Sequence, residues 1–232
     1  PFTQFGVQEI FQGRDDGAAL WGQLGGGAVK YQIGVYEGRN QAGLGNETQN
    51  FVAGAGSDDL LFAGRFTVNL LDPEAGYYNA STYHGAKDIL AIGYAFHHQN
   101  DSIGTADYDM YSFDVLFEST LGNGGVVTAA GAYYDTTGSY AAANNGRSYM
   151  VEASYLTARE FALGCCVSGK IAPFWRHQEY TRDVGAAVDR VNDWGFHYVM
   201  YGHNARVTYV YSDSDGHETD TERHLIGVQL QY

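Results

Sequence analysis

The fold of this chain is decided by the stretch Leu60-Leu61-Phe62-Ala63-Gly64-Arg65-Phe66-Thr67-Val68-Asn69-Leu70. Side chains alternate between the two faces of a β-strand, so Phe62, Phe66 and Val68 share one face, while Arg65 lies on the other. The first face suits lipid and the second suits water. Such a strand is typical of a β-barrel that crosses a membrane.

The same alternation recurs along the whole chain, in segments of about 9 to 12 residues, the length that a tilted strand needs to cross a bilayer. The expected strands are 16–25, 28–36, 60–70, 87–98, 107–118, 125–135, 148–156, 169–180, 194–202, 204–212 and 223–232. The pattern therefore predicts an all-β fold, an antiparallel transmembrane β-barrel with about eleven strands visible. We interpret 1–232 as a single outer-membrane β-barrel domain.

Composition supports this interpretation and excludes other classes. The 232 residues include 31 Gly and 3 Pro, and 15% of them are aromatic, which favours strands over helices and flexible linkers. No apolar run approaches the roughly 20 residues of a membrane helix. The net charge of −14, from 13 basic and 27 acidic residues, argues against binding to nucleic acid.

The connections between the expected strands alternate in length, as in a barrel with short periplasmic turns and longer outer loops. Long polar segments at 38–58 and 213–222 contrast with tight turns at 25–27 and 203–204. The connection 71–86 is an exception, because it is long where a short turn is expected.

Bacterial barrels have an even number of strands, whereas the visible count is odd. We therefore expect at least one strand before Pro1, so that the chain is N-terminally incomplete, and we expect residues 1–15 to belong to an outer loop.

The chain ends on an apolar face with an aromatic last residue. Ile226, Val228, Leu230 and Tyr232 alternate with smaller or polar residues. This ending resembles the signal by which outer-membrane barrels are recognised for assembly, and it places the chain in the bacterial cell outer membrane. An ordinary amphipathic edge strand is the alternative interpretation.

Several blocks resemble the phosphate-selective porin O and P family of outer-membrane channels. They are 13–17 followed by 20–22, 30–38, 72–78 with 81–90, Ala172-Pro173-Phe174-Trp175-Arg176-His177-Gln178-Glu179-Tyr180 and Tyr201-Gly202-His203-Asn204-Ala205-Arg206-Val207-Thr208-Tyr209. The resemblance implies a porin of about sixteen strands, of which roughly five are absent here, assembled as a homotrimer in a lipid bilayer with lipopolysaccharide. It also makes the long connection 71–86 a family feature.

The polar faces of the expected strands supply the candidate pore lining. The predicted pore-lining residues are Lys30, Arg65, Asp114, Glu152, Arg176 and Arg206. A pore that binds phosphate needs several closely spaced cations, and here the cations are diluted by carboxylates, so no phosphate ladder is expected in this part of the wall.

The sequence therefore predicts a passive porin for small hydrophilic solutes or ions, near neutral or weakly anion-preferring. One alternative is a structural β-barrel sheath or scaffold for a redox or surface partner. Another is a soluble β-sandwich or adhesin domain.

No enzyme, metal site or cofactor is expected. His97 and His98 are adjacent, so on a strand they point to opposite faces and cannot chelate together. The acidic segment 213–222 lacks the spacing of an EF-hand and is interpreted as a solvated loop. No nucleophile motif is present. The adjacent Cys165 and Cys166 are interpreted as two free thiols or a lipid-shielded pair, in preference to a strained vicinal disulfide.

Overall fold

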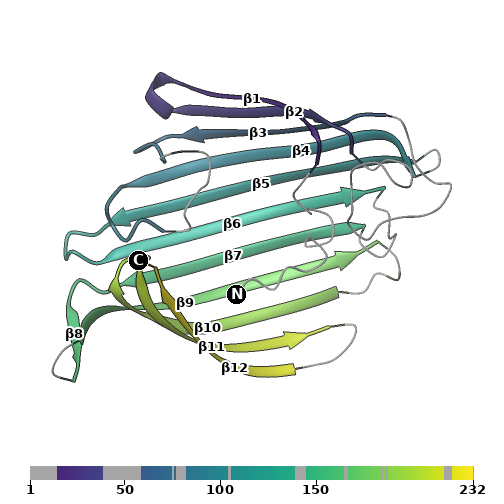
Figure 1. The fold of residues 1–232 in the computed structure, drawn as a ribbon. Helices are drawn as coiled ribbons and strands as arrows, with labels where there is room; N and C mark the ends of the chain where they lie inside the picture. The colour runs from purple at the N-terminus through teal and green to yellow at the C-terminus, as the bar shows by residue number, and fades with distance from the viewer. Residues whose placement is uncertain are drawn as a thin grey trace.

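The computed structural model describes residues 15–38, 59–74, 76, 82–103, 106–138, 145–164, 167–183, 185, 188–216 and 221–231. These residues form one antiparallel sheet of twelve strands (Figure 1). The strands are β1 (Gly17–Leu24), β2 (Val29–Tyr36), β3 (Leu61–Asn69), β4 (Ile89–Ile103), β5 (Ala106–Thr120), β6 (Val126–Thr137), β7 (Gly146–Leu156), β8 (Glu160–Leu163), β9 (Val167–Arg182), β10 (Val188–Tyr201), β11 (Ala205–Asp215) and β12 (Thr221–Leu230). A short 3-10 turn, η1 (Gly25–Gly27), links the first two.

Each long strand pairs with the next one along the chain, so the sheet is a meander from β1 to β12. This confirms the predicted all-β antiparallel fold. A small addition was not predicted: β8 lies off the main path and pairs with β9. Its four residues are too few to show a periodic pattern.

Some predicted boundaries are wrong. Strand β10 begins at Val188 rather than at 194, and β11 continues to Asp215 inside the expected acidic loop. Acidic side chains at the ends of these strands masked their alternation. The predicted loop 38–58, apart from Gly38, lies outside the described residues, as do Cys165, Cys166, Tyr232 and residues 1–14.

The sheet is curved and open (Figure 1). Among the described residues, the outermost strands β1 and β12 each pair with a single neighbour and do not pair with each other. A β-sandwich requires two packed sheets, whereas the described residues form a single sheet and so do not show the sandwich arrangement.

The two faces of the sheet differ in burial. On β5, Tyr108 and Met110 are buried, whereas Phe113 and Val115 are exposed. We call the face of Tyr108 the concave face, because residues of β7 and β12 that share it line one cavity. The opposite face is the convex face.

Large apolar side chains cover the convex face and are exposed. They are Ile33, Phe62, Phe66, Val68, Ile92, Tyr94, Tyr111, Phe113, Val115, Phe117, Tyr149, Val151, Trp175, Trp194, Phe196, Ile226, Val228 and Leu230. Buried apolar residues of the described chain form small separate clusters, such as Ile89, Ala91 and Leu116, instead of one central core. No described helix is long and apolar enough to cross a membrane.

Candidate pore-lining face

The pairing register places all six predicted pore-lining residues on the concave face. Directly opposed residues of an antiparallel pair share a face, and the register runs Lys30 to Thr67, Thr67 to Gly93, and Gly93 to Asp114. The other pairings carry this face across to β11. The six side chains differ, however, in whether they are available to a solute.

Lys30 is not an available cation. Its side chain is buried, and its Nζ donates a hydrogen bond of 2.6 Å to the carbonyl oxygen of Gly76. This ammonium group therefore holds the long connection between β3 and β4 against the sheet.

Arg65 and Asp114 neutralise each other across an intervening strand. Two guanidinium nitrogens of Arg65 on β3 donate to the two carboxylate oxygens of Asp114 on β5, at 2.7 and 2.8 Å. Gly93 on β4 lies between them, and a Cβ there would be 2.5 Å from the Arg65 guanidinium. The glycine therefore leaves the space in which this bidentate pair forms.

Arg176 is buried and paired with an acid that the sequence analysis missed. Its Nε and Nη2 donate to Oδ2 of Asp193 at 2.9 and 2.6 Å, and both side chains are almost fully buried. Asp193 was overlooked because the strand was expected to begin one residue later. Extending the alternation back from Gly195 would have put it on the same face.

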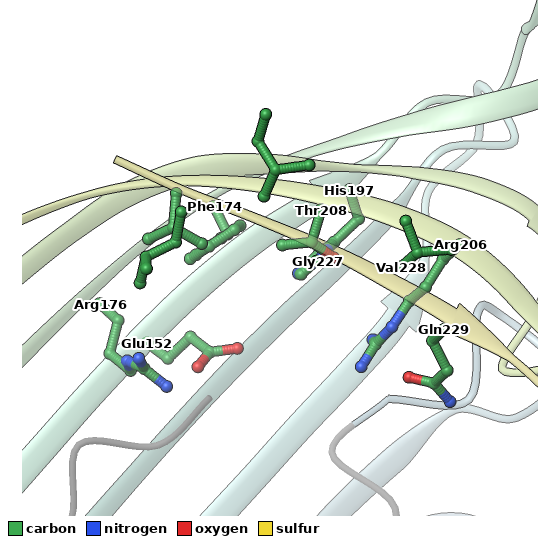
Figure 2. A pocket seen from close by; sticks show the side chains of 12 residues that line it. Glu152, Phe174, Arg176, His197, Arg206, Thr208, Gly227, Val228 and Gln229 are labelled. Atoms are coloured by element: carbon green, nitrogen blue, oxygen red, sulfur yellow. The ribbon is translucent and has the colours of Figure 1, made fainter. Parts of the chain in front are cut away.

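Glu152 and Arg206 remain available. Within the described chain, neither makes a hydrogen bond or a close ion pair, although the two charges influence each other electrostatically. Both line a cavity of about 360 Å³ under β12 (Figure 2). Figure 2 shows Glu152 beside Arg176 at one end and Arg206 beside Gln229 at the other.

A turn of the β3–β4 connection reaches across the concave face. The carboxylate of Glu118, which is fully buried, accepts hydrogen bonds from the hydroxyl of Thr82 (2.6 Å) and the backbone N–H of Tyr83 (2.9 Å) and Gly85 (2.8 Å). The hydroxyl of Thr128 on β6 donates to the same carboxylate. Glu118 is thus the anchor of this turn at β5.

The same turn also contacts the connection between β10 and β11, which lies several strands away from β5 in the sheet. The rings of His84 and His203 lie 4.6 Å apart. The pKa of His84 is lowered to about 4, mainly by burial and also by nearby His203, Arg206 and Lys170, while Glu118 acts in the opposite direction. His84 is therefore neutral where it is held.

Tyrosine hydroxyls on the convex face meet acidic side chains near one end of the strands. Tyr111 and Tyr133 both donate to Asp135 Oδ2, at 3.0 and 3.1 Å, and Tyr133 is directly opposite Tyr149 in the register. Tyrosine rings with polar tips in this position are typical of the boundary between lipid and water.

Among the predicted pore-lining cations of the described chain, Lys30, Arg65 and Arg176 are each held by a hydrogen bond or an ion pair. In the described ranges no group of three or more His, Cys, Asp or Glu could hold a metal ion. His97 and His98 face opposite sides of the sheet, and His98 Nδ1 lies 2.7 Å from Asp109.

Comparison of the chain with protein-family models, curated proteins and solved structures gives no match.

Proposed function

We propose that this chain forms the wall of a passive diffusion channel in a bacterial outer membrane, a transmembrane β-barrel that admits small hydrophilic solutes or ions. One observation carries the proposal: the sheet has an exposed apolar face bordered by tyrosines, and its opposite face bears paired and unpaired charges. An exposed apolar face of this extent is unfavourable in water and favourable in lipid.

The physical basis of conduction is the sheet itself. Strand pairing satisfies the backbone groups in lipid, and the polar concave face keeps a water-filled lumen. Ion pairs such as Arg65–Asp114 fix the positions of charges without giving the lumen a strong net sign. Solutes would then move down their gradients, selected by width and by local field.

Closure belongs to the proposal. Both free edges of the sheet must pair before a barrel can hold water, and the proposal includes the sixteen-stranded homotrimer that the family resemblance implies. Chemical crosslinking in the membrane tests the trimer.

Tryptophan fluorescence tests membrane insertion. Trp175 and Trp194 are opposite each other on the convex face, whereas Trp21 shares the concave face with Gln32. In single-tryptophan variants folded into liposomes, brominated lipids should quench Trp175 and Trp194 and should quench Trp21 much less. Equal quenching of all three would contradict the proposed orientation.

Planar bilayer recordings test the channel directly. Purified protein should produce stepwise conductance increments in KCl. Protein that inserts with the expected quenching pattern but carries no current would contradict the channel function.

A structural sheath or scaffold is the second candidate, and the turn over the concave face favours it. Anchored at Glu118 and in contact with His203, this turn crosses the hollow of the sheet. Replacing Glu118 with Gln weakens the anchor. If neither the inserted protein nor this variant conducts, the scaffold role is favoured.

A further inference from the structure

The cavity under β12 has a shape and lining suited to a small molecule. Its volume of about 360 Å³ lies in the range of small-ligand sites. Five strands contribute to its lining, from β7 to β12, so the curvature of the sheet creates it. Its lining includes two charged side chains, Glu152 and Arg206, and two rings, Phe174 and His197.

Among the described residues, most polar groups around this cavity have partners, and two do not. Arg176 is bound to Asp193, and His197 Nδ1 lies 2.7 Å from the hydroxyl of Thr208. The carboxylate of Glu152 and the guanidinium of Arg206 have no such hydrogen bond within the described chain. They lie toward opposite ends of the cavity (Figure 2).

Two stacked rings form part of the cavity wall. The rings of Phe174 and His197 are stacked, with centroids 4.7 Å apart and planes inclined by 10°. Gly227 and Gln229 of β12, which share the concave face, also line the cavity. A ligand would therefore be recognised at its two ends, while its middle packs against a ring surface.

We propose that this cavity is a binding subsite for small zwitterions of dipeptide size. Arg206 pairs with the solute carboxylate and Glu152 pairs with its ammonium group. Opposite charges at two ends recognise a solute that carries both charges, because each end forms a charge-assisted hydrogen bond. A simple anion would use only Arg206, and a simple cation only Glu152. The subsite deepens the proposed channel function and rests on it for the route by which solute arrives.

Four related probes test the inference by calorimetric titration of the detergent-folded protein at neutral pH. The probes are glycylglycine, N-acetyl-glycylglycine, glycylglycinamide and N-acetyl-glycylglycinamide. Glycylglycine should bind about tenfold more tightly than either singly charged probe, and the neutral probe should bind most weakly. Equal affinity for all four, or tightest binding of a singly charged probe, would overturn the proposal.

Two variants assign the ends of the solute. Glu152→Gln should abolish the preference for glycylglycine over its acetylated form, and Arg206→Gln should abolish the preference over the amide. The matched controls are Glu160→Gln and Arg159→Gln, which remove the same charges at exposed positions outside the cavity. Far-UV circular dichroism checks that each variant is folded.

The outcomes separate this inference from the channel function. Stepwise conductance together with equal binding of the four probes would contradict the binding subsite and support the channel function. Selective zwitterion binding without conductance supports the subsite and contradicts the channel. If Glu152→Gln weakens the acetylated probe as strongly as glycylglycine, the carboxylate does not contact the ammonium group and the proposal fails.

Discussion

His203 Nε2 lies 2.9 Å from the carbonyl oxygen of Thr82, although 121 positions separate the two residues in the chain. The ring nitrogen donates this hydrogen bond, since a carbonyl oxygen can only accept. The hydroxyl of Thr82 in turn donates to Glu118 on β5. Thr82 therefore connects β5 with the turn between β10 and β11, which lie several strands apart in the sheet.

Acid should weaken this connection through His84. Its pKa is about 4 in the folded protein, below the ordinary 6.5. Between these values the unfolded chain binds more protons, so the free energy of unfolding should fall as pH drops from 6.5 to 4. The groups facing it are His203, Glu118, Arg206 and Lys170.

Urea unfolding of the detergent-folded protein at pH 7 and pH 5 measures this effect. His84→Asn, which tolerates the positive φ of 54° at this position, should show a smaller loss between the two pH values. An unchanged pH dependence in that variant would show that other groups cause it.

A charged substitution on the convex face should reduce the stability of the lipid-folded protein far more than one on the concave face. Val115→Arg should reduce the stability of the lipid-folded protein by about 2 to 4 kcal/mol. Ala132, directly opposite Asp114 and half-buried on the concave face, gives the matched control Ala132→Arg. Thr67 lies on the same face but is buried, so an arginine there would overpack its surroundings. Equal losses in urea titrations would contradict the assignment of faces.

Gly93 should be sensitive to a single methyl group. Gly93→Ala places a Cβ against the Arg65–Asp114 pair and should cost about 1 to 3 kcal/mol. The same change made together with Arg65→Ala and Asp114→Ala should cost much less. Comparing both unfolding free energies isolates the contact, and an equal cost in the two backgrounds would place the strain elsewhere.

The buried pair of Arg176 and Asp193 should be strongly coupled. Asp193→Ala removes the carboxylate that both Nε and Nη2 of the buried Arg176 contact, and should cost about 3 kcal/mol. Arg176→Met combined with Asp193→Ala removes both charges and should cost less than the single change. A double-mutant cycle from unfolding curves measures the coupling; simple additivity would refute it.

Ion selectivity should be close to neutral despite the net charge of −14. Arg65 and Arg176 are each paired with an aspartate, which leaves Arg206 as the predicted lumen cation with an unpaired charge in the described chain. Arg206→Gln should shift the reversal potential under a KCl gradient toward cation preference, and Arg159→Gln should not. Strong cation selectivity of the unmodified protein would show that acidic loops control permeation.

The strands were predictable because a meander needs only local information. Each strand pairs with its sequence neighbour, so the alternation around Phe66 and Val68 already indicates both its extent and its exposed face. The alternation also predicted the face of all six pore-lining candidates. No long-range contact was needed for either result.

Pairing of charges was beyond reach of the alternation alone. The partner of Arg176 depends on register, which places Glu152 on one side and Asp193 on the other. The Arg65–Asp114 pair also depends on Gly93, because any side chain at that position would occupy the space in which the pair forms. The cavity under β12 depends on the curvature of the whole sheet, which no short stretch of sequence encodes.

The free edges of β1 and β12 can each act as a template on which a further β-strand pairs. Each edge presents a row of backbone donors and acceptors that any extended peptide can complete. Two copies could pair edge to edge through these groups and extend the sheet into a ribbon. Safe assembly thus requires that these edges be kept from extended chains until they pair, and a short peptide that copies β12 would act as an inhibitor of that step.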